Sequence, residues 1–251
     1  LRSRWFLGGT LLLVLVVVGL GCWVAVGAFK AKSNLEQARS SAQDAKNALL
    51  DGNAQAASES ADEALDRAEA AREATHSIAW NVVASVPWLG SPFETGQQVT
   101  DVVLGLASDV LRPAADVGIA IAPDRLYRDG RVDVDLLRSQ ERQLSELSAS
   151  AIRLNSEAGA ITDPRYVSLM RDARSQLQTQ ISSITSVIEN AALAARLVPS
   201  MMGASGQRTY FMGFQTNAES RGTGGLLGGY GILRFDNGRP AVDTLAPNTE
   251  L

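Results

Sequence analysis

The feature that most constrains this chain is an unbroken run of uncharged, mostly apolar residues from position 5 to position 29. About 20 apolar residues in a helix are enough to cross the hydrocarbon core of a bilayer. Tryptophans at positions 5 and 23 suit the interfaces of such a span, and basic residues flank it on both sides. We therefore predict that residues 1–30 form a transmembrane anchor and that the chain is a single-pass protein of the plasma membrane.

Two other interpretations of this run fit it less well. A cleaved signal peptide would have a shorter apolar core. A lipid anchor on Cys22 would call for an aliphatic residue where Gly19 stands, and the apolar run continues past the cysteine. The basic residues at the two ends are nearly balanced and do not set the orientation. We expect the N-terminus inside and the bulk of the chain to be extracytoplasmic.

Residues 31–200 have the pattern of a helical bundle or stalk. Apolar residues, many of them alanine, recur every three or four positions in 31–50 and again in 53–84, with an Asp-Gly-Asn break between the two stretches. Small residues at this spacing favour a closely packed antiparallel hairpin. Further helices are predicted at 95–121, 134–159 and 164–198, the last starting at a Thr-Asp-Pro signal and stopping at Pro199.

Residues 77–93 contain no charged side chain although the surrounding sequence is helical. If the hairpin returns antiparallel, with a rise of about 1.5 Å per residue, this segment comes back to the level at which the chain leaves the membrane. It is too short and too interrupted to be a second span. We predict that it lies in the membrane interface through Trp80, Trp88, Leu89 and Phe93. The alternative is a buried turn of the bundle.

The pattern changes from helix to strand near residue 207. Residues 208–215 and 232–235 are rich in β-forming residues, and the Asp-Asn-Gly-Arg sequence at 236–239 is typical of a hairpin turn. Because the chain stops just after a new strand begins, we expect residues 207–251 to be the first strands of an incomplete α/β domain. The predicted fold class is therefore mainly α, with a transmembrane helix, an extended helical bundle and the start of that domain.

A cluster of glycines between the two predicted strands is similar to a phosphate-binding loop only in composition. It lacks both the Gly-Lys-Ser/Thr ending of a P-loop and the third glycine of a dinucleotide-binding turn. Glycines do allow close backbone approach, and polar side chains flank them here. We predict that an anionic group such as a phosphate binds at a polar corner made by Gln215, Asn217, Glu219, Arg221, Thr223, Gly224 and Gly225. The alternative is that Arg221 pairs with a carboxylate and the glycines only let strands approach each other.

The composition excludes several classes of function. A net charge of −4 gives no basic field for binding nucleic acid. The single cysteine excludes an internal disulfide and a cysteine-based metal cluster. Any catalytic triad or histidine metal site would have to be built around the single histidine, His76. We therefore expect no cofactor, no metal site and no nucleic-acid partner, and the sequence contains no specific catalytic constellation.

Part of the strand region forms a recognisable motif block. It consists of Arg208-Thr-Tyr210, Phe214-Gln215, Asn217-Ala218-Glu219, Arg221, Thr223-Gly224-Gly225, Gly228, Tyr230-Gly231 and Asp236-Asn237-Gly238. This block resembles the signature of a bacterial family, domain of unknown function 4012. The chain departs from the family pattern at Thr216, Ser220, Gly222 and Leu226, where the family tends to have Asn, Leu, Pro and Phe. Family members also have an N-terminal membrane helix and an alanine-rich helical region with a Pro-x-x-Gly element, which here is residues 87–90.

The resemblance implies an extracytoplasmic role, because the family is common in actinobacteria and is often associated with surface polysaccharide genes. On this basis we predict a membrane-anchored scaffold or binding protein for envelope glycopolymer assembly. Its expected partners are the lipid bilayer, an envelope glycopolymer or lipid-linked glycan, and proteins or a second copy bound through the helices. One alternative is a transferase for a polyprenyl-pyrophosphate-linked glycan, similar to the LytR-CpsA-Psr proteins, with Arg221 on the phosphate and Glu219 orienting it. Another is a helical sensor ectodomain.

Overall fold

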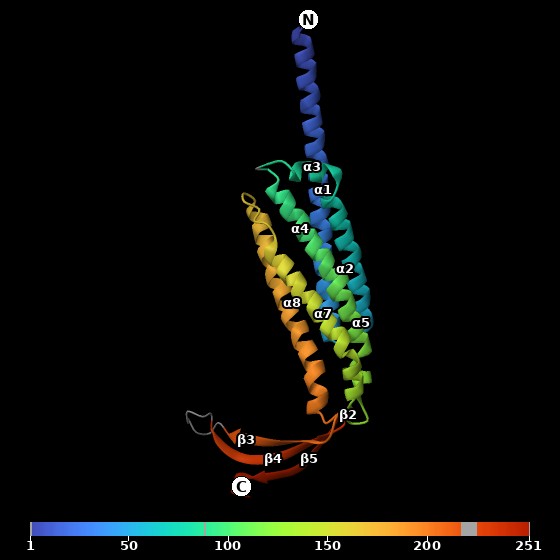
Figure 1. Cartoon of the computed structure of the whole chain (residues 1–251), viewed down its shortest axis with the longest axis vertical. Helices are drawn as coiled ribbons and strands as arrows, with labels where there is room; N and C mark the ends of the chain where they lie inside the picture. Colours follow the sequence, from blue (N-terminus) through green and yellow to red (C-terminus); the bar gives the residue numbers. More distant parts are fainter. Residues whose placement is uncertain (1, 88, 217–224, 251) are drawn as a thin grey trace. The chain divides into compact units, whose positions relative to one another are not determined.

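Helices occupy most of the chain, and three long strands follow them (Figure 1). The computed structural model describes residues 2–87, 89–216 and 225–250, with side chains described from residue 19 onward except those of Leu50, Thr216 and Leu226. In chain order the elements are α1 (Arg2–Leu50), α2 (Ala54–Thr75), α3 (Ile78–Ala84), α4 (Ser91–Leu106), η1 (Ala107–Leu111), α5 (Arg112–Ala120), α6 (Pro123–Leu126), β1 (Tyr127–Arg128), β2 (Arg131–Val132), α7 (Val134–Ala160), α8 (Ser168–Met201), β3 (Arg208–Thr216), β4 (Leu226–Asp236), β5 (Arg239–Pro247) and η2 (Asn248–Glu250). The predicted fold class, mainly helical with a small C-terminal sheet, is confirmed.

The chain divides into two compact units. The first unit contains Leu1–Asp116 and Leu147–Ile188, and the second contains Val117–Glu146 and Glu189–Leu251. Helices α7 and α8 each contribute residues to both units.

The centre of the first unit is the antiparallel pair of α1 and α2. Alanines of the two helices are buried along a common seam: Ala31, Ala38 and Ala45 on α1, and Ala57, Ala61, Ala64, Ala68 and Ala71 on α2. A methyl side chain lets two helix backbones approach closely while keeping the highest helix propensity. The turn between the helices has Gly52 at φ 73°, and the side-chain oxygen of Asn53 accepts a hydrogen bond from the N–H of Ala56 at 3.2 Å.

The stretch 53–84, predicted as one helix, contains two helices with a break at His76 and Ser77. Thr75 is buried, and its hydroxyl donates back to the carbonyl oxygen of Arg72 at 3.0 Å. The backbone of His76 caps α2, and Ser77 is extended with ψ 155°. The chain therefore changes direction at the end of α2, and α3 starts along a new axis.

The stretch 95–121, also predicted as one helix, is interrupted by the π-helical turn η1. The N–H of Arg112 bonds to the carbonyl oxygen of Ala107, five residues back. Pro113 has no N–H to offer to the carbonyl oxygen of Asp109, so an α-helical ladder would be incomplete at this point.

Helix α8 begins at Ser168, four residues later than the predicted start at 164, because side chains of α4 form hydrogen bonds with the backbone just before it. The side-chain oxygen of Gln98 accepts a hydrogen bond from the N–H of Thr162 at 2.6 Å. The hydroxyl of Thr95 donates to the carbonyl oxygen of Thr162 at 2.9 Å. The hydroxyl of Ser91 donates to the backbone carbonyl oxygen of Asp163 at 2.8 Å. These contacts between distant parts of the sequence hold residues 161–167 out of the helix.

Helix α8 also ends later than predicted, since it passes through Pro199 to Met201. The bonds that follow the proline close the last turn. The N–H of Met202 donates to the carbonyl oxygen of Val198 at 2.8 Å, and the N–H of Ala204 donates to the carbonyl oxygen of Pro199 at 2.9 Å. Gly203, at φ 80°, then reverses the chain.

Among the residues whose side chains are described, α8 is the one helix with the length and apolar composition of a membrane span. Side chains of α8 form hydrogen bonds with the backbone of α7, so this helix packs in the bundle. The Gln178 amide donates to the carbonyl oxygen of Ala158 at 2.7 Å, and the Thr185 hydroxyl donates to that of Ala151 at 3.2 Å. The predicted anchor lies mostly in residues 1–18, whose side chains are outside the described part, so it stays a prediction.

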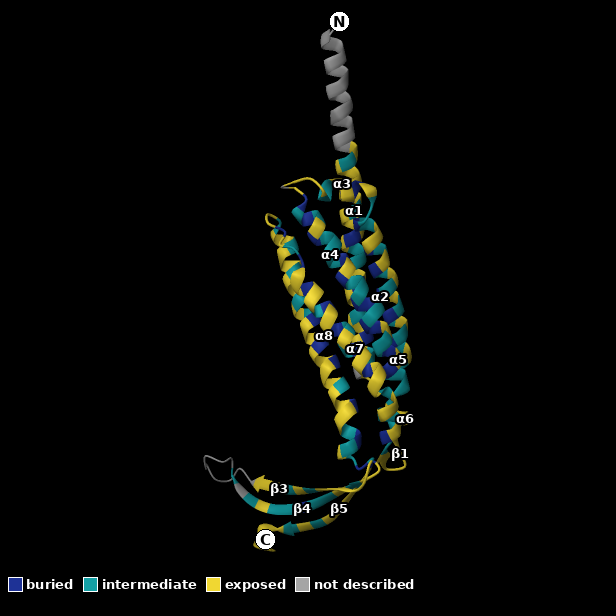
Figure 2. Ribbon diagram, viewed as in Figure 1, coloured by how far each residue is buried: buried dark blue, intermediate teal, exposed yellow. Residues whose placement is uncertain are grey.

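In the second unit the three long strands form an antiparallel sheet of order β3-β4-β5. The predicted turn is confirmed: Asn237 and Gly238, both at positive φ, join β4 to β5. A small hairpin, β1-β2, turns at Asp129-Gly130. Figure 2 shows that most residues of β3, β4 and β5 are exposed or partly exposed.

The β4–β5 turn is held by backbone bonds from two neighbouring segments of the second unit. The N–H of Val132 donates to the carbonyl oxygen of Gly238 at 3.0 Å, and the N–H of Gly238 donates to that of Met202 at 2.8 Å. A Cβ on Gly238 would collide with the carbonyl oxygen of Val132. Gly238 therefore provides both positive φ and space for close backbone approach.

The π-helical turn η1 and helix α7 are linked by an ion pair in the first unit. One guanidinium nitrogen of Arg153 lies 2.7 Å from Asp109, and another lies 3.1 Å from Glu157. Hydrogen bonds from Arg153 and from the Ser108 hydroxyl lower the pKa of Asp109 below its ordinary value. The same carboxylates raise the pKa of Arg153.

Substitution Gly238→Ala should destabilise the sheet by roughly 1–3 kcal/mol more than Gly130→Ala, since the added Cβ must displace the backbone of β2. Gly130 is the matched control because it has a similar φ, 74° against 79°, but open space around it. Hydrogen exchange of the β4 and β5 amides in the full chain measures the difference. Equal losses of protection in the two variants would contradict this account of the turn.

Substitution Asp109→Asn should lower the free energy of unfolding by about 1 kcal/mol or less near neutral pH, since both partners are about half exposed. Because the folded-state pKa is lowered, the carboxylate's contribution is fully present above the unfolded pKa of about 3.9. It is lost as the pH falls through the lower folded-state value. Denaturation of both proteins as a function of pH, with exposed Asp44→Asn as control, measures this. A difference that is as large at low pH as at neutral pH would contradict it.

Candidate functional site

The polar corner predicted from the sequence lies mostly outside the described residues. Asn217, Glu219, Arg221, Thr223 and Gly224 belong to the part of the chain that is not described. Its two ends are described.

At these ends, Gln215 is exposed near the end of β3, directly after a β-bulge, and Gly225 precedes β4 at φ 130°, a conformation that favours glycine. Anion binding at the corner therefore remains a prediction.

Two glycines of β4 have a packing role. A Cβ on Gly229 would lie 3.0 Å from the carbonyl oxygen of Ala246, and one on Gly231 would lie 3.1 Å from that of Thr244. Glycine at these positions lets β5 approach β4 closely, as the alternative interpretation of the glycine cluster expects.

The residues predicted to lie in a membrane interface fall into two groups. Trp80 is 5% exposed, and its ring packs edge-on against that of Phe93 with centroids 5.2 Å apart. The indole N–H also donates to the carbonyl oxygen of Phe93 at 2.9 Å. These two rings face the interior of the first unit, as in the alternative of a buried turn. Leu89 is exposed, and Trp88 is outside the described residues.

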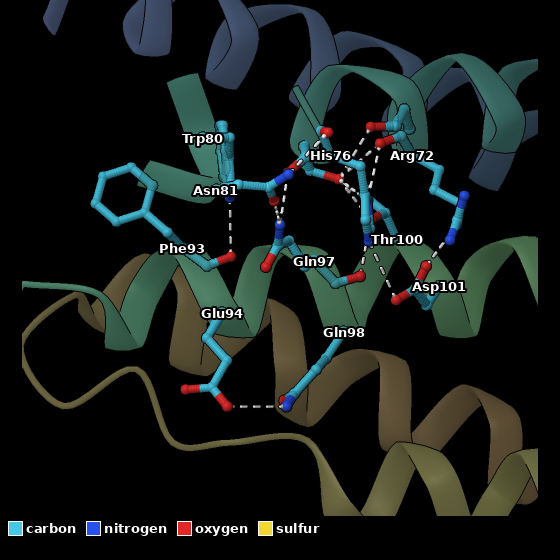
Figure 3. A network of polar contacts seen from close by, with 12 residues as sticks. Arg72, His76, Trp80, Asn81, Phe93, Glu94, Gln97, Gln98, Thr100 and Asp101 are labelled. Atoms are coloured by element: carbon cyan, nitrogen blue, oxygen red, sulfur yellow. Dashed lines mark hydrogen bonds and ion pairs between the residues drawn. The ribbon is translucent and has the colours of Figure 1, made fainter. Parts of the chain in front are cut away.

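The most developed side-chain arrangement in the first unit is a polar network at the end of α2 (Figure 3). The Arg72 guanidinium donates to one carboxylate oxygen of Asp101 on α4 at 2.6 Å. Nε2 of His76 lies 3.5 Å from the other oxygen, and Nδ1 lies 3.0 Å from the carbonyl oxygen of Arg72. Asp101 thus contacts Arg72 in the last turn of α2 and His76, the residue that caps this helix.

Gln97 extends the network from α4 to α3. Its amide donates to the carbonyl oxygen of Thr75 at 3.0 Å and to the side-chain oxygen of Asn81 at 2.6 Å. Deeper inside, the hydroxyls of Thr75 and Thr100 are 2.8 Å apart and buried. These bonds specify where α3 sits on α2 and α4.

The network includes a threonine, a histidine and an aspartate in contact, but its geometry does not suit nucleophilic catalysis. The Thr75 hydroxyl lies 3.2 Å from Nδ1 of His76, yet Thr75 is 1% exposed and already bonds to Thr100 and to backbone. A nucleophile must reach its substrate. No group of three or more potential metal ligands occurs among the described residues.

Sequence reasoning missed the outward face of α3. Ile78 and Val82 of α3 are exposed, and so are Val86 and Leu89 in the turn after it. The spacing of four residues between Ile78 and Val82 places both on one face of the helix and was available in the sequence. The interface was predicted instead from the large aromatic residues of the segment, of which Trp80 and Phe93 face inward.

Substitution Thr100→Val should lower the free energy of unfolding by about 1–2 kcal/mol, since it removes a hydroxyl partner from the buried Thr75. Thr179→Val is the matched control: Thr179 is exposed on α8 and bonds only its own helix in the described structure. Equilibrium denaturation of the full chain in detergent gives both values. A loss no larger than that of the control would show that the hydroxyl pair does not stabilise the unit.

Comparison with known proteins gives one match, in the C-terminal part of the chain. Residues 205–251, which include β3, β4 and β5, match the model of a family described as protein of unknown function (DUF4012). No curated protein and no solved structure shows a significant match to the chain. The match supports the resemblance to this family for the sheet and its connections.

Proposed function

We propose that the chain is a membrane-anchored, extracytoplasmic scaffold or binding protein that takes part in envelope glycopolymer assembly. The observation that carries the proposal is the continuity of α1, which runs from Arg2 to Leu50 as one helix. The uncharged run 5–29 forms its first half, and the alanine seam with α2 begins in its second half. A bilayer around the first half would therefore hold the helical unit directly, without a flexible linker.

The surface of the sheet supports the binding part of the proposal. Phe211 and Phe214 of β3 and Val242 and Leu245 of β5 are all exposed. Large apolar side chains exposed on a small sheet favour an interaction surface. A scaffold needs such surfaces, whereas nothing in the described residues resembles a catalytic centre.

The envelope part of the proposal comes from the family resemblance of the strand region. The family's association with surface polysaccharide genes favours a glycopolymer or its lipid-linked precursor as the ligand. The polar corner, with Arg221 as its cation, is the place where a precursor phosphate would bind, because a guanidinium forms charge-assisted hydrogen bonds with phosphate.

Deletion of the gene in its native host should lower the amount of wall-attached glycopolymer, and the intact chain should restore it. The Arg221→Ala variant should bind a polyprenyl phosphate more weakly, but it should still restore attachment, since a scaffold forms and breaks no covalent bond at this guanidinium. Arg239→Ala, which removes an exposed arginine of β5, is the control. Binding of a polyprenyl phosphate to each purified chain is measured in parallel.

Unchanged polymer after deletion would contradict the envelope role. A transferase would instead lose attachment by about tenfold or more in Arg221→Ala, the scale expected for one lost charge-assisted contact. That result, with binding retained, would replace the scaffold by the enzyme.

A further inference from the structure

We propose that α3 and the turn after it form a collar that rests in the surface of the lipid bilayer beside α1. The collar consists of Ile78, Val82, Val86 and Leu89. The inference rests on the proposed membrane anchor and adds a second contact between the protein and the bilayer.

Two of the collar side chains lie on α3 and the other two lie in the turn after it. Ile78 is 79% exposed and Leu89 is 57% exposed, and Val82 and Val86 are exposed as well. The opposite face carries Ala79 and Trp80, which are buried. Exposed aliphatic side chains on one side of a short helix, with buried residues on the other, are the geometry of an interfacial element.

The level of the collar along α1 follows from the packing of its inner face. Ala79 and Trp80 form one buried cluster with Val24 of α1, and Leu20 packs against the same cluster. A Cβ on Gly27 would lie 3.6 Å from the Trp80 ring. All three α1 positions belong to the uncharged run 5–29, so α3 is attached to the end of the predicted span (Figure 1).

The outer surface of α1 at this level is also apolar, with exposed Trp23, Val26 and Phe29. Lys30 and Lys32, both exposed, follow within one turn. An apolar surface that contains a tryptophan and is followed by exposed lysines matches the change from hydrocarbon to headgroups. This surface is continuous with the predicted span, and α3 packs on the same stretch of α1, which favours lipid over a protein partner as the occupant.

The turn after α3 is built to hold Leu89 outward. A Cβ on Gly90 would collide with the carbonyl oxygen of Ala84, so the tight turn depends on glycine at that position. The Tyr166 hydroxyl, from the loop between α7 and α8, donates to the carbonyl oxygen of Leu89 at 2.7 Å. Tyrosine is itself typical of membrane interfaces, and Tyr166 is exposed at this end of the unit.

The test uses the full chain with Cys22→Ser and one new cysteine, Ile78→Cys or Leu89→Cys, labelled with an environment-sensitive dye. The proteins are placed in vesicles of phosphatidylcholine and phosphatidylglycerol that carry spin labels at a shallow or a deep position. Glu59→Cys, on the exposed side of α2, is the control. Leu15→Cys reports on the anchor, and circular dichroism verifies that each labelled chain is folded.

The collar labels should emit at shorter wavelength and lose about half or more of their emission to the shallow spin label, as for side chains roughly 5–10 Å into the interface. The label at Glu59→Cys should show neither the shift to shorter wavelength nor the loss of emission. Water-like, unquenched emission at both collar positions, with Leu15→Cys quenched by the deep spin label, would overturn the collar and leave the anchor intact. An unquenched label at Leu15→Cys would overturn the anchor itself.

Discussion

The close approach of α1 and α2 through alanine methyl groups is the interaction on which the first unit depends. Five alanines of α2 are at most 1% exposed, and they face the buried alanines of α1. Larger residues would force the two helices apart, at a typical cost of about 1–3 kcal/mol per site. The uncharged run and the residues of this seam belong to the same helix, α1. The predicted anchor is therefore joined to the bundle by continuous helix.

Residues at the end of the hairpin fix the position of α3 through its inner face. Buried hydroxyls and the Gln97 amide place α3 on α2 and α4, while Trp80 and Phe93 fill the space behind it. The polar bonds are directional and so specify one position for a helix of seven residues. Its outer face is then free to carry apolar side chains that the bundle does not use.

Local patterns predicted much of the helical region and of the hairpin turn at Asn237-Gly238, because alanine spacing and turn chemistry act over a few residues. They failed where distant segments decide the outcome. The late start of α8 depends on Ser91, Thr95 and Gln98 of α4, about 70 residues earlier in the chain. The polar corner could be predicted only as a set of residue types, and most of it lies outside the described residues.

The proposed function depends first of all on membrane anchoring through α1, with the helical unit outside the cell. Alkaline carbonate extraction of membranes from cells that express the full chain, followed by protease treatment of intact spheroplasts, tests it directly. We expect the chain to stay in the membrane pellet and the added protease to digest residues 31–251. Release of the chain into the carbonate supernatant, or complete protection from protease in intact spheroplasts, would contradict it.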